Sequence, residues 1–182
     1  MPHEPMTMIR SARLDLVLVT ERELKTGTLE DRPFANPHGV YSNEPLPRAN
    51  RAADVASNPT HISWYYRIMV DRARNLAVGS ISFHAAPDAS GMAEIGLGVA
   101  EAERGKGFAG EAVRAMWDWA STQEGVRRLR YTVSPTNAPS IALIHRLDVP
   151  EIGVQIDEED GPELIFETTV EAWKAGRRLE TE

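Results

Sequence analysis

The hydrophobic pattern of the chain changes its period near residue 100, and this change constrains the fold more than any other feature. Ile95, Leu97 and Val99 alternate with glutamate and glycine, which predicts a strand. Apolar residues then recur at helical spacing and predict an amphipathic helix ending near Gly125; they are Phe108, Ala109, Ala112, Val113, Met116, Trp117 and Ala120. A strand that leads into a helix over one short segment points to the α/β (α+β) class.

The remaining pattern predicts a mixed, mostly antiparallel sheet flanked by helices. Turn residues between 62 and 99 favour an antiparallel meander of three strands, and Asn137 with Pro139 opens a second helix that runs to Leu147. A helical turn around Trp173 closes the chain, and an acidic turn over 158–161 joins the last two strands. The predicted strands cover residues 14–19, 62–70, 76–85, 92–99, 129–133, 151–157 and 163–170.

Residues 20–60 lack a hydrophobic period and contain five prolines, at positions 33, 37, 45, 47 and 59. We expect short helical turns and loops here rather than a long element. A stretch of this length inside a compact domain is typical of a substrate-facing loop. The 182 residues have the length of one domain, so we assign 1–182 to a single domain.

Composition excludes several classes of protein. The chain has no cysteine, which rules out a disulfide scaffold, cysteine-ligated zinc, iron–sulfur clusters and thiol nucleophiles. No cluster of histidine and carboxylate residues has metal-ligand spacing, so we expect no metal site. Neither a membrane-length apolar run nor a secretory signal is present, and we therefore expect a cytoplasmic protein without membrane contact.

The formal net charge of −7 argues against a nucleic-acid partner, because binding to a phosphate backbone depends on clustered Lys and Arg. The excess of acidic residues is confined to the C-terminal part of the sequence. Residues 1–149 carry 17 basic and 17 acidic side chains, whereas residues 150–182 carry 3 basic and 10 acidic ones. The first 149 residues are thus balanced in charge and can hold one anionic ligand.

A glycine-rich turn over residues 104–110 precedes the first long helix. Its small residues leave the N–H groups of the first helical turn accessible, so a phosphate can approach the backbone, and Arg104 and Lys106 add positive charge. A plain turn that caps a surface helix is the alternative. Gly105, Gly107 and Gly110 also match the dinucleotide fingerprint. In that motif, however, the strand runs directly into the first glycine, whereas here polar residues separate the two.

Beyond these physical features, Arg104-x-x-Gly107-x-Ala109 resembles the acetyl-CoA signature [QR]-x-x-G-x-[GA] of the GCN5-related N-acetyltransferase (GNAT) superfamily. The strand over 94–99 and the helix start Asn137-x-x-Ser140 resemble further family elements. The opening over 11–16 is similar to that of the branch containing ribosomal-protein N-terminal acetyltransferases. The resemblance implies a twisted sheet of about six to seven strands.

The resemblance also implies an acetyl-CoA site within residues 92–147. The pyrophosphate would lie on the N–H groups of residues 105–110 beside Arg104, and the pantetheine arm would run along the strand from Leu97 to Val99. The implied cofactor-binding residues are Leu97, Val99, Arg104, Gly105, Lys106, Gly107, Phe108, Ala109, Gly110, Asn137 and Ser140.

Three residues are candidates for catalysis. Glu94 is the first candidate base, because it alternates away from the apolar strand face and family members often carry a glutamate on this strand; a solvated strand residue is the alternative. His84 has a suitable unperturbed pKa, although a structural histidine fits equally. Ser134 could hold a water or the cofactor, but a serine before proline is commonly part of a turn.

The sequence departs from the family at Ile144, where many members place a tyrosine that acts as general acid. The helix then ends in Leu147-Asp148-Val149-Pro150 instead of Leu-Gly-Phe. We therefore assign no residue to the role of general acid: either the thiolate leaves unassisted or another group serves.

The resemblance implies an N-acetyltransferase that moves an acetyl group from acetyl-CoA to the primary amine of a protein N-terminus or a small molecule. An acidic protein suits a cationic acceptor such as a polyamine or an aminoglycoside. An acyl-CoA-binding sensor or scaffold without turnover is the alternative, and a nicotinamide-dinucleotide protein is a third. Dimers are frequent among the proteins that the chain resembles, so a homodimer is a further expectation.

Overall fold

The computed structural model describes residues 8–42, 45–157 and 161–179. Its elements in chain order are β1 (Met8–Arg10), β2 (Leu14–Leu18), α1 (Glu21–Thr26), α2 (Pro45–Ser57), η1 (Pro59–Trp64), β3 (Arg67–Asp71), β4 (Leu76–Phe83), β5 (Met92–Val99), η2 (Glu101–Glu103), α3 (Phe108–Ala120), β6 (Arg128–Val133), α4 (Ala138–Arg146), β7 (Glu151–Asp157), β8 (Gly161–Thr169) and α5 (Val170–Leu179).

The strands of the described residues form one sheet of eight, in the order β1-β2-β3-β4-β5-β6-β8-β7. Neighbouring strands are antiparallel except β5 and β6, which are parallel and connected through α3. This confirms the mixed, mostly antiparallel sheet, with slightly more strands than the six to seven expected. The added strand β1 has three residues, too few for a period to appear in the sequence.

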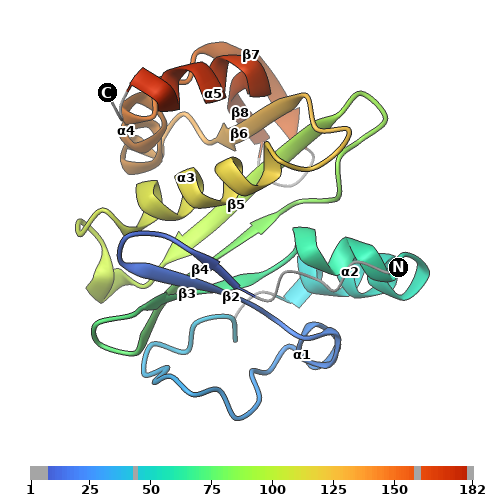
Figure 1. Cartoon of the computed structure of the whole chain (residues 1–182), viewed down its shortest axis with the longest axis vertical. Helices are drawn as coiled ribbons and strands as arrows, with labels where there is room; N and C mark the ends of the chain where they lie inside the picture. Colours follow the sequence, from blue (N-terminus) through green and yellow to red (C-terminus); the bar gives the residue numbers. More distant parts are fainter. Residues whose placement is uncertain (1–7, 43–44, 158–160, 180–182) are drawn as a thin grey trace.

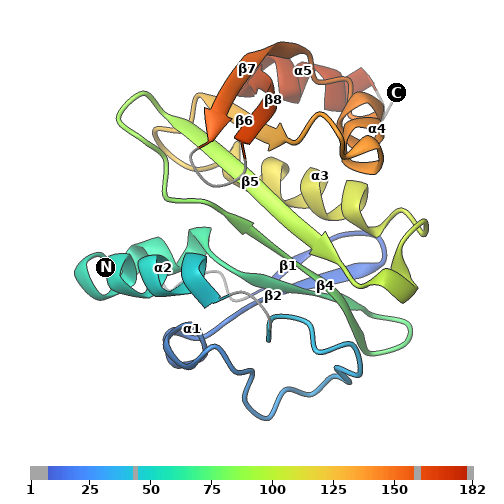
Figure 2. The same cartoon turned by 180° about the vertical axis from the view of Figure 1, so that it is seen from behind.

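Helices cover both faces of the sheet. In Figure 1 α3 lies in front of β5, and in Figure 2, seen from behind, β5 passes in front of α3. The core under α3 contains Trp117, Met116 and Phe83, all fully buried. A second apolar cluster contains Leu24 of α1, Val55 of α2 and the strand residue Ile68. We call these the α3 face and the α2 face of the sheet.

Two expectations for the N-terminal third are wrong. Residues 45–57, expected as loops and turns, form the 13-residue helix α2, with its prolines 45 and 47 in the first turn. Proline is tolerated there because first-turn N–H groups have no partner within the helix. The strand expected from residue 62 begins at Arg67, because Pro59 starts a 3-10 helix that continues to Trp64.

The later elements agree with the sequence. Strands β4, β5 and β6, helices α3 and α4, and the hairpin β7–β8 occupy the predicted segments, with ends shifted by a few residues. Residues 158–160 of the predicted acidic turn over 158–161 lie outside the described residues, and Gly161 begins β8. Among the described helices none is both long and apolar enough to cross a membrane.

Candidate active site

The glycine-rich turn adopts a backbone that favours glycine. Gly105 and Gly107 have φ of 75° and 83°, and Gly107 is the N-cap of α3. Within the described residues the backbone N–H groups of 105–110 donate no hydrogen bond to another part of the protein. Arg104 is exposed, its Nε donates to the carbonyl of Val99 at 3.2 Å, and no described carboxylate pairs with it. Accessible N–H groups and a cation thus meet at one helix N-terminus.

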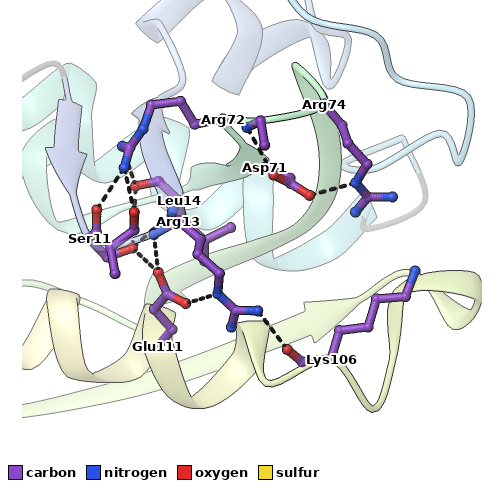
Figure 3. A network of polar contacts seen from close by, with 10 residues as sticks. Ser11, Arg13, Leu14, Asp71, Arg72, Arg74, Lys106 and Glu111 are labelled. Atoms are coloured by element: carbon purple, nitrogen blue, oxygen red, sulfur yellow. Dashed lines mark hydrogen bonds and ion pairs between the residues drawn. The ribbon is translucent and has the colours of Figure 1, made fainter.

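A polar network from the turn between β1 and β2 fixes this helix N-terminus (Figure 3). The carboxylate of Glu111 in α3 accepts from Ser11 Oγ and from the backbone N–H of Arg13, both at 2.6 Å, and from Arg13 Nε at 2.7 Å. Arg13 Nη1 also donates to the carbonyl of Lys106 at 3.0 Å. Arg13 was not among the predicted site residues, because its partners lie more than 90 positions away in the sequence.

The contacts of Glu111 counteract the effect of burial on its pKa. Burial alone would raise its pKa, but the hydrogen bonds from Ser11 and Arg13 and the charge of Arg13 hold the pKa below its usual value. Glu111 is therefore ionised at neutral pH and keeps Arg13 against the glycine-rich turn.

The ammonium of Lys106 does not reach toward the open N–H groups. It donates to Glu103 at 2.8 Å, and Figure 3 shows it extending away from Arg13. Glu103 also accepts from Arg74 at 2.6 Å, and the hydrogen bonds from Arg74 and Lys106 lower the pKa of Glu103 to about 2. The charge of Lys106 is thus balanced by Glu103, as that of Arg13 is by Glu111. Among these three cations of the described turn region, Arg104 is the one without a carboxylate partner.

The other predicted residues around this turn support it structurally. Phe108 is buried, with the guanidinium of Arg13 4.8 Å from its ring centre. Ala109 is half-buried in the first helical turn. A Cβ added to Gly110 would lie 3.2 Å from Leu143 Cδ1, so Gly110 allows α3 and α4 to pack closely. Asn137 caps α4 by accepting from the N–H of Ser140 at 3.2 Å.

Strands β5 and β6 separate beside this helix. Their ladder ends at the pair Ile95–Tyr131, although β5 continues to Val99. The backbone carbonyl of Glu94 accepts a hydrogen bond from the backbone N–H of His84 and therefore points toward β4. Because backbone groups alternate along a strand, the N–H and C=O groups of Leu97 and Val99 point to the β6 side, beyond the end of that ladder.

A hollow lies on the α2 face of β4 and β5. It has a volume of about 200 Å³ and is lined by Arg51, Tyr66, Ser80, Ile81, Ser82, His84, Gly96 and Leu97. Large residues such as Ile81 and Phe83 belong to the core on the α3 face, whereas the alternating positions Ser80, Ser82 and Gly96 are small. The alternation of large and small residues along two paired strands therefore creates the hollow.

One predicted catalytic residue, His84, lines this hollow, and a second, Glu94, lies beside His84. His84 Nδ1 lies 3.5 Å from the Oε1 of Glu94, which accepts a hydrogen bond from Thr132 Oγ1 at 2.5 Å. Loss of hydration against the sheet lowers the pKa of His84, while the nearby charge of Glu94 opposes that shift. The net effect keeps the imidazole neutral at neutral pH, as a proton acceptor must be.

The remaining candidates lie elsewhere. Ser134 follows β6, and its hydroxyl lies 2.9 Å from that of Thr136, which is the turn alternative considered above. Ile144 is fully buried in the core. In the part of the chain that the structure describes, no group of three or more histidine and carboxylate side chains is arranged to hold a metal ion.

Comparison with known proteins identifies the family. The sequence model of the acetyltransferase (GNAT) domain matches residues 13–149. The uncharacterized N-acetyltransferase YjdG of Bacillus subtilis is 26% identical over 152 residues, which is 78% of this chain and 89% of YjdG. The uncharacterized N-acetyltransferase p20 of Bacillus licheniformis is 35% identical over 82 residues, and that match spans 45% of this chain and only 46% of p20.

A solved structure shares the fold. The RimJ protein of Mycobacterium smegmatis, solved in complex with a CoA disulfide, superposes with a TM-score of 0.63 at 19% identity, covering 91% of this chain and 88% of RimJ. Because the domain match spans most of the chain, the chain belongs to the GNAT family of acetyltransferases.

Proposed function

We propose that the protein transfers an acetyl group from acetyl-CoA to a primary amine that enters the hollow on the α2 face. The observation that carries the proposal is the gap between β5 and β6, with the accessible N–H groups of residues 105–110 at one end and the His84–Glu94 pair at the other. Residues 92–147 would form the acetyl-CoA-binding segment, within a single domain over 1–182.

In the proposed complex the N–H groups of residues 105–110 and the guanidinium of Arg104 bind the pyrophosphate. The pantetheine amides hydrogen-bond to the backbone of Leu97 and Val99, like an added strand. Asn137 and Ser140 line the α4 side of this site. Lys106, whose charge is held by Glu103, contributes its backbone rather than its ammonium.

The proposed chemistry is direct attack of the amine nitrogen on the thioester carbonyl. Alkyl amines titrate near ~10 and are mostly protonated at neutral pH, so the ammonium loses a proton before its nitrogen attacks. His84 Nε2 accepts that proton, while Glu94 acts as a positioning residue that holds Nδ1. The C–N bond forms, the C–S bond breaks, and CoA leaves as a thiolate; thiols titrate near ~8.5, so solvent suffices as proton donor.

A thiol-release assay over a panel of amines, amino acids, peptides and antibiotics tests the proposal. We expect acetyl-CoA cleavage that depends on the added amine. Arg104→Ala should raise the KM for acetyl-CoA about tenfold, as expected for a lost hydrogen bond to a charged group, with little change in kcat. Arg22→Ala, at an exposed arginine of α1, serves as control. Absence of binding by both acetyl-CoA and CoA in calorimetry would refute the assignment of this site.

A further inference from the structure

We propose that the acceptor is a small molecule that carries a carboxylate as well as its primary amine, and that Arg51 binds the carboxylate. This inference rests on the proposed function and names the substrate class of the same hollow. Arg51 belongs to α2, is 8% exposed and lines the hollow together with His84.

Arg51 has a hydrogen-bonding capacity that the protein does not use. Its Nη1 donates to the hydroxyl of Tyr66 at 2.9 Å, and its guanidinium lies 4.8 Å from the centre of the Tyr66 ring. Its Nε is buried and has no hydrogen-bond partner, and no carboxylate of the described residues pairs with the guanidinium. A buried cation without a counter-charge is costly, and a carboxylate bound in the hollow that Arg51 lines would supply the missing counter-charge.

A second buried arginine shows that unpartnered guanidinium nitrogens do not by themselves mark a ligand-binding residue. Arg67 is fully buried and has two nitrogens without partners, Nε and Nη1. However, its strand register places it opposite Ile81 on the α3 face, with its guanidinium 5.6 Å from the centre of the Trp119 ring. Arg67 therefore lies in the core, whereas Arg51 combines an unpartnered N–H with a place in the wall of the hollow.

Charges of opposite sign lie around the hollow. Arg51 is on the α2 side, while Glu94 lies next to His84, and the carboxylates of Glu163 and Asp157 in the hairpin β7–β8 also act on that imidazole. An acceptor with an amine at one end and a carboxylate at the other matches this distribution. A polyamine would bring a second ammonium toward Arg51, so the local charges disagree with the cationic acceptor that the net charge suggested.

The size of the hollow favours a small acceptor. Its volume of about 200 Å³ lies below the ~300–1,000 Å³ typical of small-molecule pockets. Ser80, Ser82 and Gly96 add no bulky side chain to its floor. An amino acid is a class of small molecule that carries both an amine and a carboxylate.

The test compares matched acceptors in the thiol-release assay. The common α-amino acids, β-alanine and γ-aminobutyrate are each measured beside the corresponding amide, which keeps the amine and removes the charge. We expect wild-type kcat/KM to be at least about tenfold higher for the best acid than for its amide, the size expected for a charge-assisted hydrogen bond. Equal values for acid and amide would overturn the inference.

Variants of Arg51 test whether this side chain binds the carboxylate. Arg51→Gln should abolish the preference, so that acid and amide react with the same kcat/KM. Arg51→Lys should keep part of the preference, because it retains the charge but not the planar fork. Melting temperatures of both variants show whether they fold. An equal fall for acid and amide in a folded Arg51→Gln would show that the arginine is structural.

Failure of the inference is distinguishable from failure of the proposed function. Turnover of polyamines, or of peptides with an acidic first residue, while free amino acids stay unreacted would reject the small amino-acid acceptor and keep the acetyltransferase. If neither CoA species binds, the proposed function fails. Calorimetric binding of the amino acid to wild type and not to Arg51→Gln would then still support the role of Arg51, and equal binding to both would reject it.

Discussion

Gly96 leaves room for the imidazole of His84: a Cβ added to Gly96 would lie 2.9 Å from His84 Nε2. Gly96→Ala should therefore displace the imidazole from the hollow. Because the atom that must move is the end of a side chain, we expect little change in melting temperature. We expect a loss of kcat on the order of 100-fold, the lower range for a lost general base.

Gly98 supplies the matched control for this prediction. It lies two residues further on the same strand face, and a Cβ added there meets nothing within 4 Å. Gly98→Ala should keep wild-type activity. Equal activity losses in the two variants would show that the placement of His84 is not what limits turnover.

The pH dependence of the reaction should report His84. Its pKa lies below the ordinary value because partial loss of hydration disfavours the imidazolium, so kcat/KM should rise with pH along an acidic limb whose midpoint lies below that value. Glu94 raises the pKa of His84, and Glu94→Gln should therefore move the limb to lower pH. An unchanged limb in Glu94→Gln, or its persistence in His84→Gln, would contradict the proposed pair.

Replacing Gly107, whose backbone is left-handed, should weaken CoA binding in addition to lowering stability. Gly107→Ala forces a φ of 83° on alanine and places its Cβ 3.3 Å from Arg13 Nη2, so we expect weaker binding of CoA in calorimetry. The backbone strain should cost ~1–2 kcal/mol of unfolding free energy.

Gly39→Ala is the control, since Gly39 has φ of 60° and open space around it. It should lose similar stability and keep the affinity for CoA. If both variants bind CoA as wild type does, residues 105–110 form a plain turn.

Acid should weaken the network around Glu111. Burial would raise its pKa, but hydrogen bonds from Ser11 and Arg13 bring it below its value in the unfolded chain. A lowered pKa means that the stabilisation is present above the unfolded-state pKa and is lost as the pH falls through the folded-state pKa.

Glu111→Gln should therefore reduce stability at neutral pH and flatten the fall in stability below about pH 4.5. Denaturant melts across this range measure the effect. Identical profiles for Glu111→Gln and wild type would mean that the network contributes no net stability.

Local patterns made the second half of the fold predictable. The alternation through Val99, the helical period from Phe108 and the cap at Asn137 depend on neighbouring residues, and the elements follow them. The sequence pattern does not predict helix α2, because prolines 45 and 47 favour loops in general and are compatible with a helix only in its first turn. In the same way Pro59 starts a 3-10 helix where an alternating pattern predicted a strand.

The site was predictable only in part. The glycine-rich turn lies within one short segment, so its backbone could be anticipated. Arg13 and Arg51 could not be found in this way, because Glu111 lies 98 positions from Arg13, and Arg51 reaches the hollow only through the packing of α2 on the sheet. The sequence pattern and the resemblance pointed to Glu94 and His84 as candidates, but they did not predict the contact between the two side chains.

The alternation of large and small residues along β4 and β5 has a consequence for how such a protein can evolve. Ile81 and Phe83 hold the core on one side of the sheet, while Ser80, Ser82 and Gly96 shape the hollow on the other. Exchanges at Ser80 and Ser82 can change the shape of the hollow without disturbing core packing. Selectivity and foldability are therefore encoded at interleaved positions of the same strands, and one can diverge while the other is conserved.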